Sequence, residues 1–385
     1  MNLDLTPEQQ ELRRTVRTFA EEVVAPRTAE TDATGAFPLD VVEAMGRLGL
    51  FGIPFPTENG GRGAGHLDMC LAIEELARAD SSVAITLAAG VGIGAAPVAL
   101  FGSPEQKERW LAPICRGEML AGFGVTELGA GSDVAAMRTR ARRDGDEWVL
   151  DGRKSYITNS GTPITGFCTV AAVTGEAVRG PEISMFIVPA DTKGFTVGHS
   201  YRKLGWRSSD THELVFEGCR VPRESLLSER GRGLAQALQV LDGGRVGVAA
   251  VAVGLAQGCL DVSLDRAKDR QAFGRPIGSM EAIQVKLADM HVGVETARLA
   301  TWHAAWLRDE GRPFAGAAAR AKLYSSEVAV ACAREAIQIH GGSGFMDDSL
   351  PARFYRDAKI LEIGEGTSEI QRLVIARDLG LPSPL

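Results

Sequence analysis

The chain has 385 residues, which is too long for one ordinary hydrophobic core, so we expect two or three domains. Its net charge of -7, without a long Lys/Arg run, argues against a nucleic-acid binder. No uninterrupted apolar stretch reaches about 18 residues, so we expect no membrane span. The six cysteines and six histidines are scattered without the spacing of disulfide frameworks or metal ligands. We therefore expect reduced thiols, no metal site and a cytoplasmic protein.

Residues 1–119 are predicted to form an N-terminal α-helical domain. Apolar residues such as Leu12 and Val16 recur at helical spacing, behind an N-cap and a proline at the first helical position. Two further helices are predicted over 38–48 and 69–79.

Residues 120–225 change character and predict an antiparallel β domain. Short apolar runs are separated by Gly and Pro, and Asp144-Gly145-Asp146 sits between two runs as the turn of a hairpin. Further short strands are predicted over 167–173, 183–189, 195–198 and 214–216. The pattern is not that of alternating strands and helices, so we do not expect a parallel βαβ sheet.

Residues 226–385 are predicted to form a C-terminal α-helical bundle domain. Long apolar-periodic segments cover 246–267, 282–307 and 317–339. The order helical, then β, then helical predicts an α+β multidomain fold in which a four-helix bundle packs beside the β domain.

One glycine motif is a false lead. Gly90, Gly92 and Ala95 fit a loose dinucleotide-binding fingerprint, but no βαβ unit surrounds them. We interpret this segment as a small-residue helix that packs closely on a neighbour. A nicotinamide-dependent Rossmann enzyme is therefore disfavoured.

Two segments of the β domain have the composition of a ligand site. Residues 123–133 begin as a strand and end in a glycine-rich turn, where free backbone N–H groups and the hydroxyls of Thr126 and Ser132 can donate to a ligand. Residues 156–159, Tyr-Ile-Thr-Asn, end a strand with side chains that could line a flat ring. Each segment alone is also compatible with ordinary structure.

Glu365 is the strongest single candidate for chemistry. It lies between two glycines, among apolar residues, just before a predicted helix in which Ser368 and Gln371 fit a capping box and Gly380 ends the helix. A carboxylate partly removed from water gains basicity, which abstraction of a proton next to a carbonyl requires.

Together with four further segments, these three resemble the acyl-CoA dehydrogenase family over essentially the whole chain. The further segments, in order, are 241–245 (LDGGR), 270–274 (RQAFG), 338–342 (QIHGG) and 355–358 (YRDA). The chain is most similar to the short-chain, butyryl-type members. The resemblance implies the three-domain fold of that family and an FAD cofactor.

The resemblance also implies residue roles. Six residues match positions at the flavin ring: Phe123, Val125, Thr126, Ser132, Tyr156 and Thr158. Five match positions that hold the FAD pyrophosphate and adenine across a subunit interface: Arg270, Phe273, Gln338, Gly341 and Gly342. Two match further FAD contacts: Thr367 and Glu369. Four match positions near the substrate: Ser132, Asp242, Arg245 and Gly366. Glu365 matches the catalytic base.

The implied reaction is α,β-dehydrogenation of an acyl-CoA thioester to the trans-2-enoyl thioester. The thioester carbonyl would accept a hydrogen bond from the Glu365 backbone N–H, Glu365 would remove the α-proton, and hydride would pass to flavin N5. Electrons would then pass to an electron-transferring flavoprotein, and the assembly would be a homotetramer. Branched-chain relatives carry the base at the position of Gly244, so Glu365 is the only matching candidate here.

The sequence departs from the family pattern at two positions. Gly364 stands where Tyr is common, either because the backbone needs a positive φ or because the pocket is wider. Glu281 stands where many members have Gln, which could weaken one contact to the adenosine. Acyl chain length and branching stay open.

Two alternatives keep the same fold. One is an acyl-CoA oxidase that uses O2, and the other is a dehydrogenase whose acyl group is held by a carrier protein. A non-enzymatic acyl-CoA-binding protein is disfavoured by the intact base and FAD segments.

Overall fold

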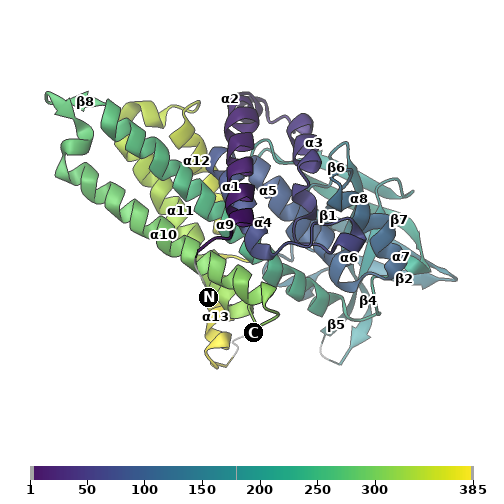
Figure 1. Cartoon of the computed structure of the whole chain (residues 1–385). Helices are drawn as coiled ribbons and strands as arrows, with labels where there is room; N and C mark the ends of the chain where they lie inside the picture. Colours follow the sequence, from purple (N-terminus) through teal and green to yellow (C-terminus); the bar gives the residue numbers. More distant parts are fainter. Residues whose placement is uncertain (1–3, 179, 383–385) are drawn as a thin grey trace.

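The computed structural model describes residues 4–178 and 180–382. It has a helical N-terminal part, a β sheet and a long helical C-terminal part, so the predicted α+β multidomain fold is confirmed. The N-terminal helices lie between the sheet and the C-terminal bundle (Figure 1). This placement brings the N-terminal helices into contact with both other parts, through α4 (His66–Ala79) on α9 (Gly233–Asp269) and η4 (Gly90–Ala95) on β1 (Leu120–Gly124).

The N-terminal part begins with Thr6, whose side chain and that of Gln9 form the capping box of α1, as the N-cap prediction required. The helical segments of this part are α1 (Pro7–Phe19), η1 (Ala20–Val24), α2 (Ala25–Thr34), α3 (Leu39–Arg47), η2 (Leu50–Gly52), η3 (Thr57–Asn59), α4 (His66–Ala79), α5 (Ser81–Ala89), η4 (Gly90–Ala95), α6 (Ala96–Phe101), α7 (Pro104–Gln106), η5 (Lys107–Leu111) and α8 (Ala112–Cys115). Three of them, η1, η4 and η5, are π-helical turns that continue a neighbouring α-helix.

The sheet has the strand order β1-β4-β2-β3-β7-β6, with β5 paired beside β4. Its strands are β1 (Leu120–Gly124), β2 (Arg140–Asp144), β3 (Glu147–Thr158), β4 (Thr165–Ala177), β5 (Gly180–Pro189), β6 (Phe195–Ser200) and β7 (Thr211–Pro222). Short 3-10 turns, η6 (Val134–Ala136) and η7 (Arg223–Ser225), flank it. The predicted hairpin is present as β2–β3. Most pairings are antiparallel, but β4 runs parallel to both β1 and β2.

The C-terminal part is built on three long helices, α9, α10 and α11, that pack along one another. Its elements are α9 (Gly233–Asp269), β8 (Gln271–Ala272), β9 (Arg275–Pro276), η8 (Ile277–Ser279), α10 (Glu281–Asp309), α11 (Ala315–His340), η9 (Gly341–Phe345), α12 (Leu350–Leu361) and α13 (Ser368–Asp378). The β8–β9 hairpin projects from the end of the bundle farthest from the sheet (Figure 1).

The predicted capping box of the last helix is wrong by one residue. The N-cap of α13 is Thr367, whose Oγ1 accepts a hydrogen bond from the backbone N of Ile370 at 3.3 Å. Ser368 is the first helical residue, and the Gln371 side chain turns back to the carbonyl oxygen of Gly366 instead. Gly380 follows the helix with a φ of +82°, as its predicted role at the helix end requires.

The expectation that no apolar stretch is long enough to span a membrane is also corrected. Two helical segments, 81–101 and 233–269, pass that test by length and composition. In both, 78% of the most apolar window is buried inside the protein. They are core helices of this fold, and their hydrophobicity is used for packing.

The glycine-rich segment of η4 is the close-packing helix that we expected. A Cβ atom on Gly94 would lie 2.5 Å from the carbonyl oxygen of Ala121 in β1, so only glycine fits this approach. Two hydrogen bonds join the sheet domain to helices elsewhere. The side-chain amide of Asn159 donates to the Thr86 carbonyl at 3.1 Å, and the backbone N–H of Trp206 donates to the Asp357 carboxylate at 2.7 Å. The domains therefore pack tightly where β1 meets η4.

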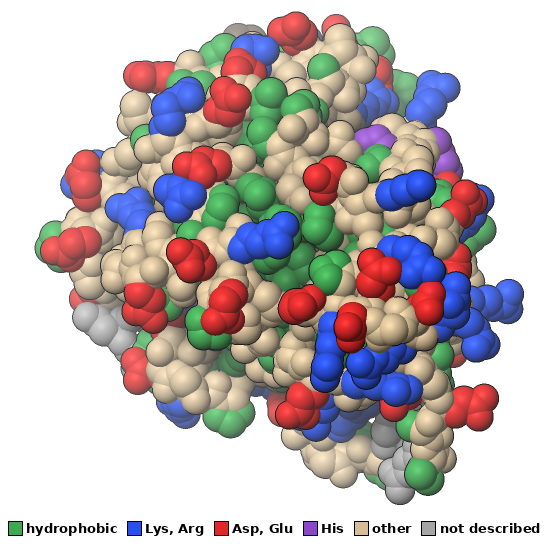
Figure 2. Space-filling view, turned by 90° about the vertical axis from the view of Figure 1, so that its right-hand side faces the viewer, with side chains coloured by type: hydrophobic (Ala, Val, Ile, Leu, Met, Phe, Trp, Pro, Cys, Tyr) green, Lys and Arg blue, Asp and Glu red, His purple; other side chains and the backbone are tan. Residues whose placement is uncertain are grey.

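The surface and the cysteines complete this description. Figure 2 looks onto the sheet side of the molecule, where Lys and Arg side chains gather toward the lower right and apolar side chains gather near the middle. The net negative charge is therefore unevenly spread.

All six cysteines are free and buried, as expected for reduced thiols.

Candidate active site

Glu365 lies in the loop between α12 and α13, with its side chain against α9. A Cβ atom added to Gly244 of α9 would lie 1.9 Å from Glu365 Oε2, so the carboxylate occupies the space that the missing side chain leaves. The Oε2 atom is buried and has no hydrogen-bond partner among the described residues. A buried, unpartnered carboxylate oxygen is available to bind a proton.

The surroundings of Glu365 place its pKa near neutrality. Burial raises the pKa of the carboxyl to about 7, although the positive charges of Lys322 and Arg245 lower it. Arg245 is itself buried, and its guanidinium forms an ion pair with Asp242 at 2.5 Å. Two of the predicted substrate-side residues, Asp242 and Arg245, thus stand beside the predicted base.

Small residues connect the base to the sheet. A Cβ atom on Gly92 of η4 would lie 3.5 Å from the Cα atom of Gly244, and Ile93 Cγ2 would lie 2.9 Å from a Cβ atom on Gly244. The same η4 turn contacts Ala121 of β1 through Gly94. Residues of α9, η4 and β1 therefore pack in succession between Glu365 and the sheet, and residues 123–126 continue from β1.

The predicted flavin-ring residues lie on two adjacent segments of the sheet. Phe123 and Val125 are buried and Thr126 is half-buried, while Ser132 is exposed. The Ser155 N–H donates to the Thr126 carbonyl at 2.9 Å and so fastens this segment to β3. Added Cβ atoms on Gly129 and Gly131 would meet nothing, so the turn leaves open space.

On β3, Tyr156 and Thr158 continue the same surface. Tyr156 has a φ of 63°, is 54% exposed and packs its ring on Tyr201 with the centroids 4.8 Å apart. Thr158 is half-buried. An aromatic residue held with a positive φ and an exposed face is strained, and such strain is concentrated at ligand sites.

A buried ion pair that sequence reasoning missed supports this segment. Lys154 is completely buried, and its Nζ donates to Glu127 at 2.8 Å and to the Val125 carbonyl at 3.2 Å. Glu127 also accepts from the backbone N–H groups of Arg138 and Thr139. The pair therefore fixes both ends of the glycine-rich turn. Strict alternation would place Lys154 on the same face as the exposed Tyr156, but β3 has a register shift between Lys154 and Ile157, so the sequence pattern gives no signal that Lys154 is buried.

The five residues predicted to serve the adenine end of FAD lie elsewhere. Arg270 and Phe273 lie at the β8–β9 hairpin, and Gln338, Gly341 and Gly342 lie at the end of α11 and in η9. Along α9 the distance from Gly244 to Arg270 is roughly 40 Å at 1.5 Å per residue. The structure does not bring these residues to Glu365 within one chain.

The side chains of Arg270 and Phe273 in the hairpin are exposed to solvent. Phe273 is 94% exposed with a φ of 52°. The guanidinium of Arg270 is exposed and makes no hydrogen bond or ion pair with the residues that the structure describes, although its backbone N–H and carbonyl are both hydrogen-bonded. Gly341 has a φ of +63°, and an added Cβ atom on Gly341 or Gly342 would meet nothing. An exposed aromatic ring, a free cation and open backbone are suited to a ligand or a second molecule.

The other two predicted FAD contacts lie at the start of α13. Thr367 is half-buried as its N-cap, and Glu369 is exposed. Gly366, predicted to contact substrate, is adjacent to the base and has a φ of +94°. Glu281, one of the departures from the family pattern, is the exposed first residue of α10.

Lys322 is the second functional candidate that sequence reasoning missed. It is fully buried on α11, and its Nζ donates to the Gly366 carbonyl oxygen at 2.8 Å. Burial lowers the pKa of Lys322 to about 8, although the nearby Glu365 carboxyl raises it. A signal existed in the sequence, because helical spacing places Lys322 on the buried stripe with Ala318, Ser325 and Ala329.

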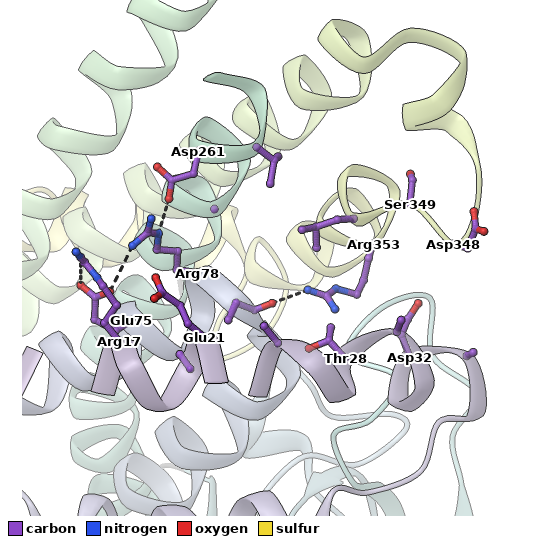
Figure 3. Close-up of a pocket in the computed structure, with 18 of the residues that line it drawn as sticks. Arg17, Glu21, Thr28, Asp32, Glu75, Arg78, Asp261, Asp348, Ser349 and Arg353 are labelled. Carbon is purple, nitrogen blue, oxygen red and sulfur yellow. Dashed lines mark hydrogen bonds and ion pairs between the residues drawn. The ribbon is translucent and has the colours of Figure 1, made fainter. Parts of the chain in front are cut away.

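A hollow of about 420 Å³ between α1, η1, α2, α4, α9 and the start of α12 is not part of this site. Its charged side chains bind one another, with Arg17 bound to Glu75 and Arg78 bound to Asp261 (Figure 3). It contains none of the predicted site residues. Within 4–178 and 180–382, no cluster of three His, Cys, Asp or Glu side chains could hold a metal ion.

A small cavity of about 30 Å³ lies on the other side of the Gly244 helix turn. It is lined by Gly92 of η4 and by Gly243 and Gly247 of α9, and Met69 and Arg308 are also in its wall. Its volume is roughly that needed for one water molecule. Glu365 is not among the residues that line this cavity.

Known proteins match this chain over nearly its whole length. Profiles of the N-terminal, middle and C-terminal domains of acyl-CoA dehydrogenase match residues 6–118, 122–219 and 231–380. A probable acyl-CoA dehydrogenase of Bacillus subtilis is 49% identical over 380 residues, covering 98% of this chain and 100% of the relative.

Two solved structures superpose closely. Butyryl-CoA dehydrogenase from Megasphaera elsdenii has a TM-score of 0.95 at 40% identity, covering 98% of this chain and 100% of the other. A chain from work on the electron transferring flavoprotein of Acidaminococcus fermentans and flavin-based electron bifurcation has a TM-score of 0.95 at 41% identity, covering 98% and 99%. The chain belongs to the acyl-CoA dehydrogenase family.

Proposed function

We propose that the chain is an FAD-dependent acyl-CoA dehydrogenase that converts a short acyl-CoA thioester to its trans-2-enoyl thioester, with Glu365 as the catalytic base. The observation that carries this proposal is the buried, unpartnered Oε2 of Glu365, which lies against Gly244 of α9. Burial that raises the pKa of this carboxyl to about 7 gives it the basicity to remove an α-proton at neutral pH.

The residues that follow β1 and those at the end of β3 fit FAD. The open turn at Gly129 and Gly131, the exposed Tyr156 and the half-buried Thr126 and Thr158 would contact the ring system. Bound there, FAD would supply the oxidising chemistry by accepting the β-hydrogen with its electron pair. A flat aromatic surface with hydroxyl and backbone donors at its rim suits such a ring.

The chain's own groups would activate the substrate. The backbone N–H of Glu365 donates no hydrogen bond within the described residues, so it is free to bind the thioester carbonyl oxygen. A hydrogen bond to that oxygen stabilises the negative charge that develops as the α-proton leaves. Glu365 would take the proton. The ion pair of Arg245 and Asp242 would lie beside the substrate on the α9 side.

We further propose a homotetramer in which Arg270 and Phe273 serve a neighbouring subunit's FAD. The exposed hairpin supports this, and so does an exposed apolar stripe on α10. The stripe consists of residues spaced by seven: Val285, Val292 and Leu299. Such a stripe on a long helix is typical of a helix–helix interface. As electron acceptor we propose an electron-transferring flavoprotein, and as compartment the cytoplasm.

We propose a short, straight acyl chain, because the protein chain is 40% identical to butyryl-CoA dehydrogenase from Megasphaera elsdenii over 98% of its length. The test is anaerobic titration of the purified yellow protein with a panel of acyl-CoA thioesters, following loss of the flavin absorbance and identifying the product. Rapid bleaching by butyryl-CoA with formation of the trans-2-enoyl thioester is expected. Bleaching only by carrier-protein thioesters, or rapid reoxidation of the product complex by O2, would contradict the proposal in favour of one of the same-fold alternatives.

A further inference from the structure

The backbone that carries Glu365 is strained. Glu365 has a φ of 53° and Gly366 a φ of 94°, so two successive residues occupy the left-handed region. Glycine adopts that conformation freely, but a glutamate does so only where its surroundings enforce it. Some other part of the protein must therefore hold this turn.

Two buried side chains from different helices hold it. The Gly366 carbonyl oxygen accepts from Lys322 Nζ of α11 at 2.8 Å and from Gln371 Nε2 of α13 at 2.9 Å. Gln371 Nε2 also lies 3.3 Å from the Glu365 carbonyl oxygen. Lys322 and Gln371 are both fully buried. The turn is thus fastened from two directions immediately beside the carboxylate.

Packing alone does not account for a lysine at this position. No carboxylate of the described residues forms an ion pair with Lys322, and an unpaired ammonium is costly to bury. A methionine would fill the same volume without that cost. The lysine is explained if both its hydrogen bond and its charge serve the Glu365 turn.

We infer that Lys322 and Gln371 are positioning residues for the base: together they hold the left-handed Glu365–Gly366 turn, and the charge of Lys322 stabilises the ionised carboxylate. This inference rests on the proposed role of Glu365. Lys322 contacts the loop at the Gly366 carbonyl oxygen, so it acts through Glu365.

The charges around Glu365 give the inference a measurable sign. The cations near the carboxyl are Lys322 of α11 and Arg245 of α9, and the anions nearby are Asp242 of α9, Glu362 of the loop and Glu369 of α13. Arg245 is already paired with Asp242, so Lys322 is the unpaired cation of this group. Removing its charge disfavours the ionised carboxylate, so the pKa of Glu365 must rise above about 7.

The experiment compares variants in FAD-loaded tetrameric enzyme, with flavin content checked by absorbance. Lys322→Met removes the charge and the hydrogen bond, Lys322→Arg keeps the charge, and Gln371→Leu removes only a neutral donor. Lys286→Met is the matched control, since Lys286 of α10 is paired with Glu335 and lies away from the loop. The pH dependence of kcat/KM is measured, and protonation of the Glu365 carboxyl is followed by infrared difference spectroscopy against Glu365→Gln.

Lys322→Met is expected to move the infrared pKa and the pH profile upward by about one unit, with roughly a fivefold loss of kcat/KM at pH 7 because the ionised fraction of Glu365 falls by that factor. Lys322→Arg should keep the profile near that of the wild type. Gln371→Leu should lower kcat without moving the profile, and it tests the turn even if Lys322→Met fails to fold. A Lys322→Met profile equal to that of Lys286→Met, or an unchanged kcat in Gln371→Leu, would overturn the inference. Full activity of Glu365→Gln would instead overturn the proposed base.

Discussion

The carboxylate of Glu365 occupies the space that the absent side chain of Gly244 leaves on α9, so two positions far apart in the sequence converge on one point. A Cβ atom on Gly244 would lie 1.9 Å from Glu365 Oε2. A carboxylate placed at either position, 244 or 365, would therefore reach the same point. In this chain Glu365 fills that space, so position 244 has no room for a side chain.

Gly244→Ala is therefore expected to displace the carboxylate. Because misplacement of a reacting group by about 1 Å can cost 10²-fold in rate, kcat/KM for butyryl-CoA should fall by about that factor. Gly247→Ala is the matched control on the same helix, since a Cβ atom there meets only ordinary contacts at 3.6 Å or more. Equal kcat/KM values for the two variants, at equal flavin content, would show that the convergence has no functional consequence.

The pH dependence follows from the raised pKa of Glu365. Burial raises this pKa to about 7, and only the ionised carboxylate can accept the α-proton. We expect kcat/KM of the wild type to rise with pH through about 7 and to level off above it. A rate already constant from pH 5 upward would mean that the carboxyl ionises at its ordinary pKa or that another group is the base.

Gly364 and Gly366 flank Glu365 but should respond differently to substitution. Gly364 is not among the residues with positive φ, and a Cβ atom there would lie 3.5 Å from the Ile360 carbonyl oxygen, an ordinary contact. The explanation that Gly364 is required by a positive φ is therefore wrong for this structure. Gly366 has a φ of +94°, and a Cβ atom there would lie 2.7 Å from Gln371 Nε2.

We accordingly expect Gly364→Tyr to fold, to keep activity on butyryl-CoA and to lose kcat/KM selectively on longer or α-branched thioesters. Gly366→Ala should lose activity on every substrate alike, because it strains the turn that holds the base. The measurement is kcat/KM for butyryl-CoA and one α-branched thioester in both variants. A uniform loss in Gly364→Tyr would exclude a pocket widened by the missing ring.

Arg270 is expected to contribute to FAD retention. Losing one charge-assisted hydrogen bond to a phosphate should weaken FAD binding by roughly tenfold or more, and it should loosen the oligomer as well if the FAD belongs to a neighbouring subunit. Arg275→Ala in the same exposed hairpin is the control for loss of a surface charge. Flavin content and sedimentation are compared after dilution. An Arg270→Ala protein that stays fully flavinated and tetrameric would reduce Arg270 to a surface cation.

Much of this molecule could be predicted from local patterns. The long helices, the β2–β3 hairpin and the position of Glu365 before α13 all follow from periodicity, turn residues and glycine placement. The domain boundaries after residues 119 and 225 stay a prediction. The parallel pairing of β1 with β4 was not predicted, because it joins segments separated by more than 40 residues through contacts that leave no local pattern.

The site itself was only partly predictable. The flanking glycines identify Glu365. The spacing of Gln371 from Ser368 fits a capping box, so the sequence does not reveal that Gln371 binds the Gly366 carbonyl oxygen. Lys322 and Lys154 were missed because the sequence does not show which partner a buried ammonium binds, even where helical spacing places the lysine on a buried stripe, as it does for Lys322. Long-range hydrogen bonds, which do not show in the sequence, decide these roles.

The most direct test of the account is the rate of anaerobic flavin bleaching by butyryl-CoA in Glu365→Gln under single-turnover conditions. A neutral amide cannot accept the α-proton, so the variant should bind FAD and substrate normally but bleach about 10³-fold more slowly than the wild type, or not at all. Bleaching at a rate near that of the wild type would contradict the assignment of Glu365 as the base.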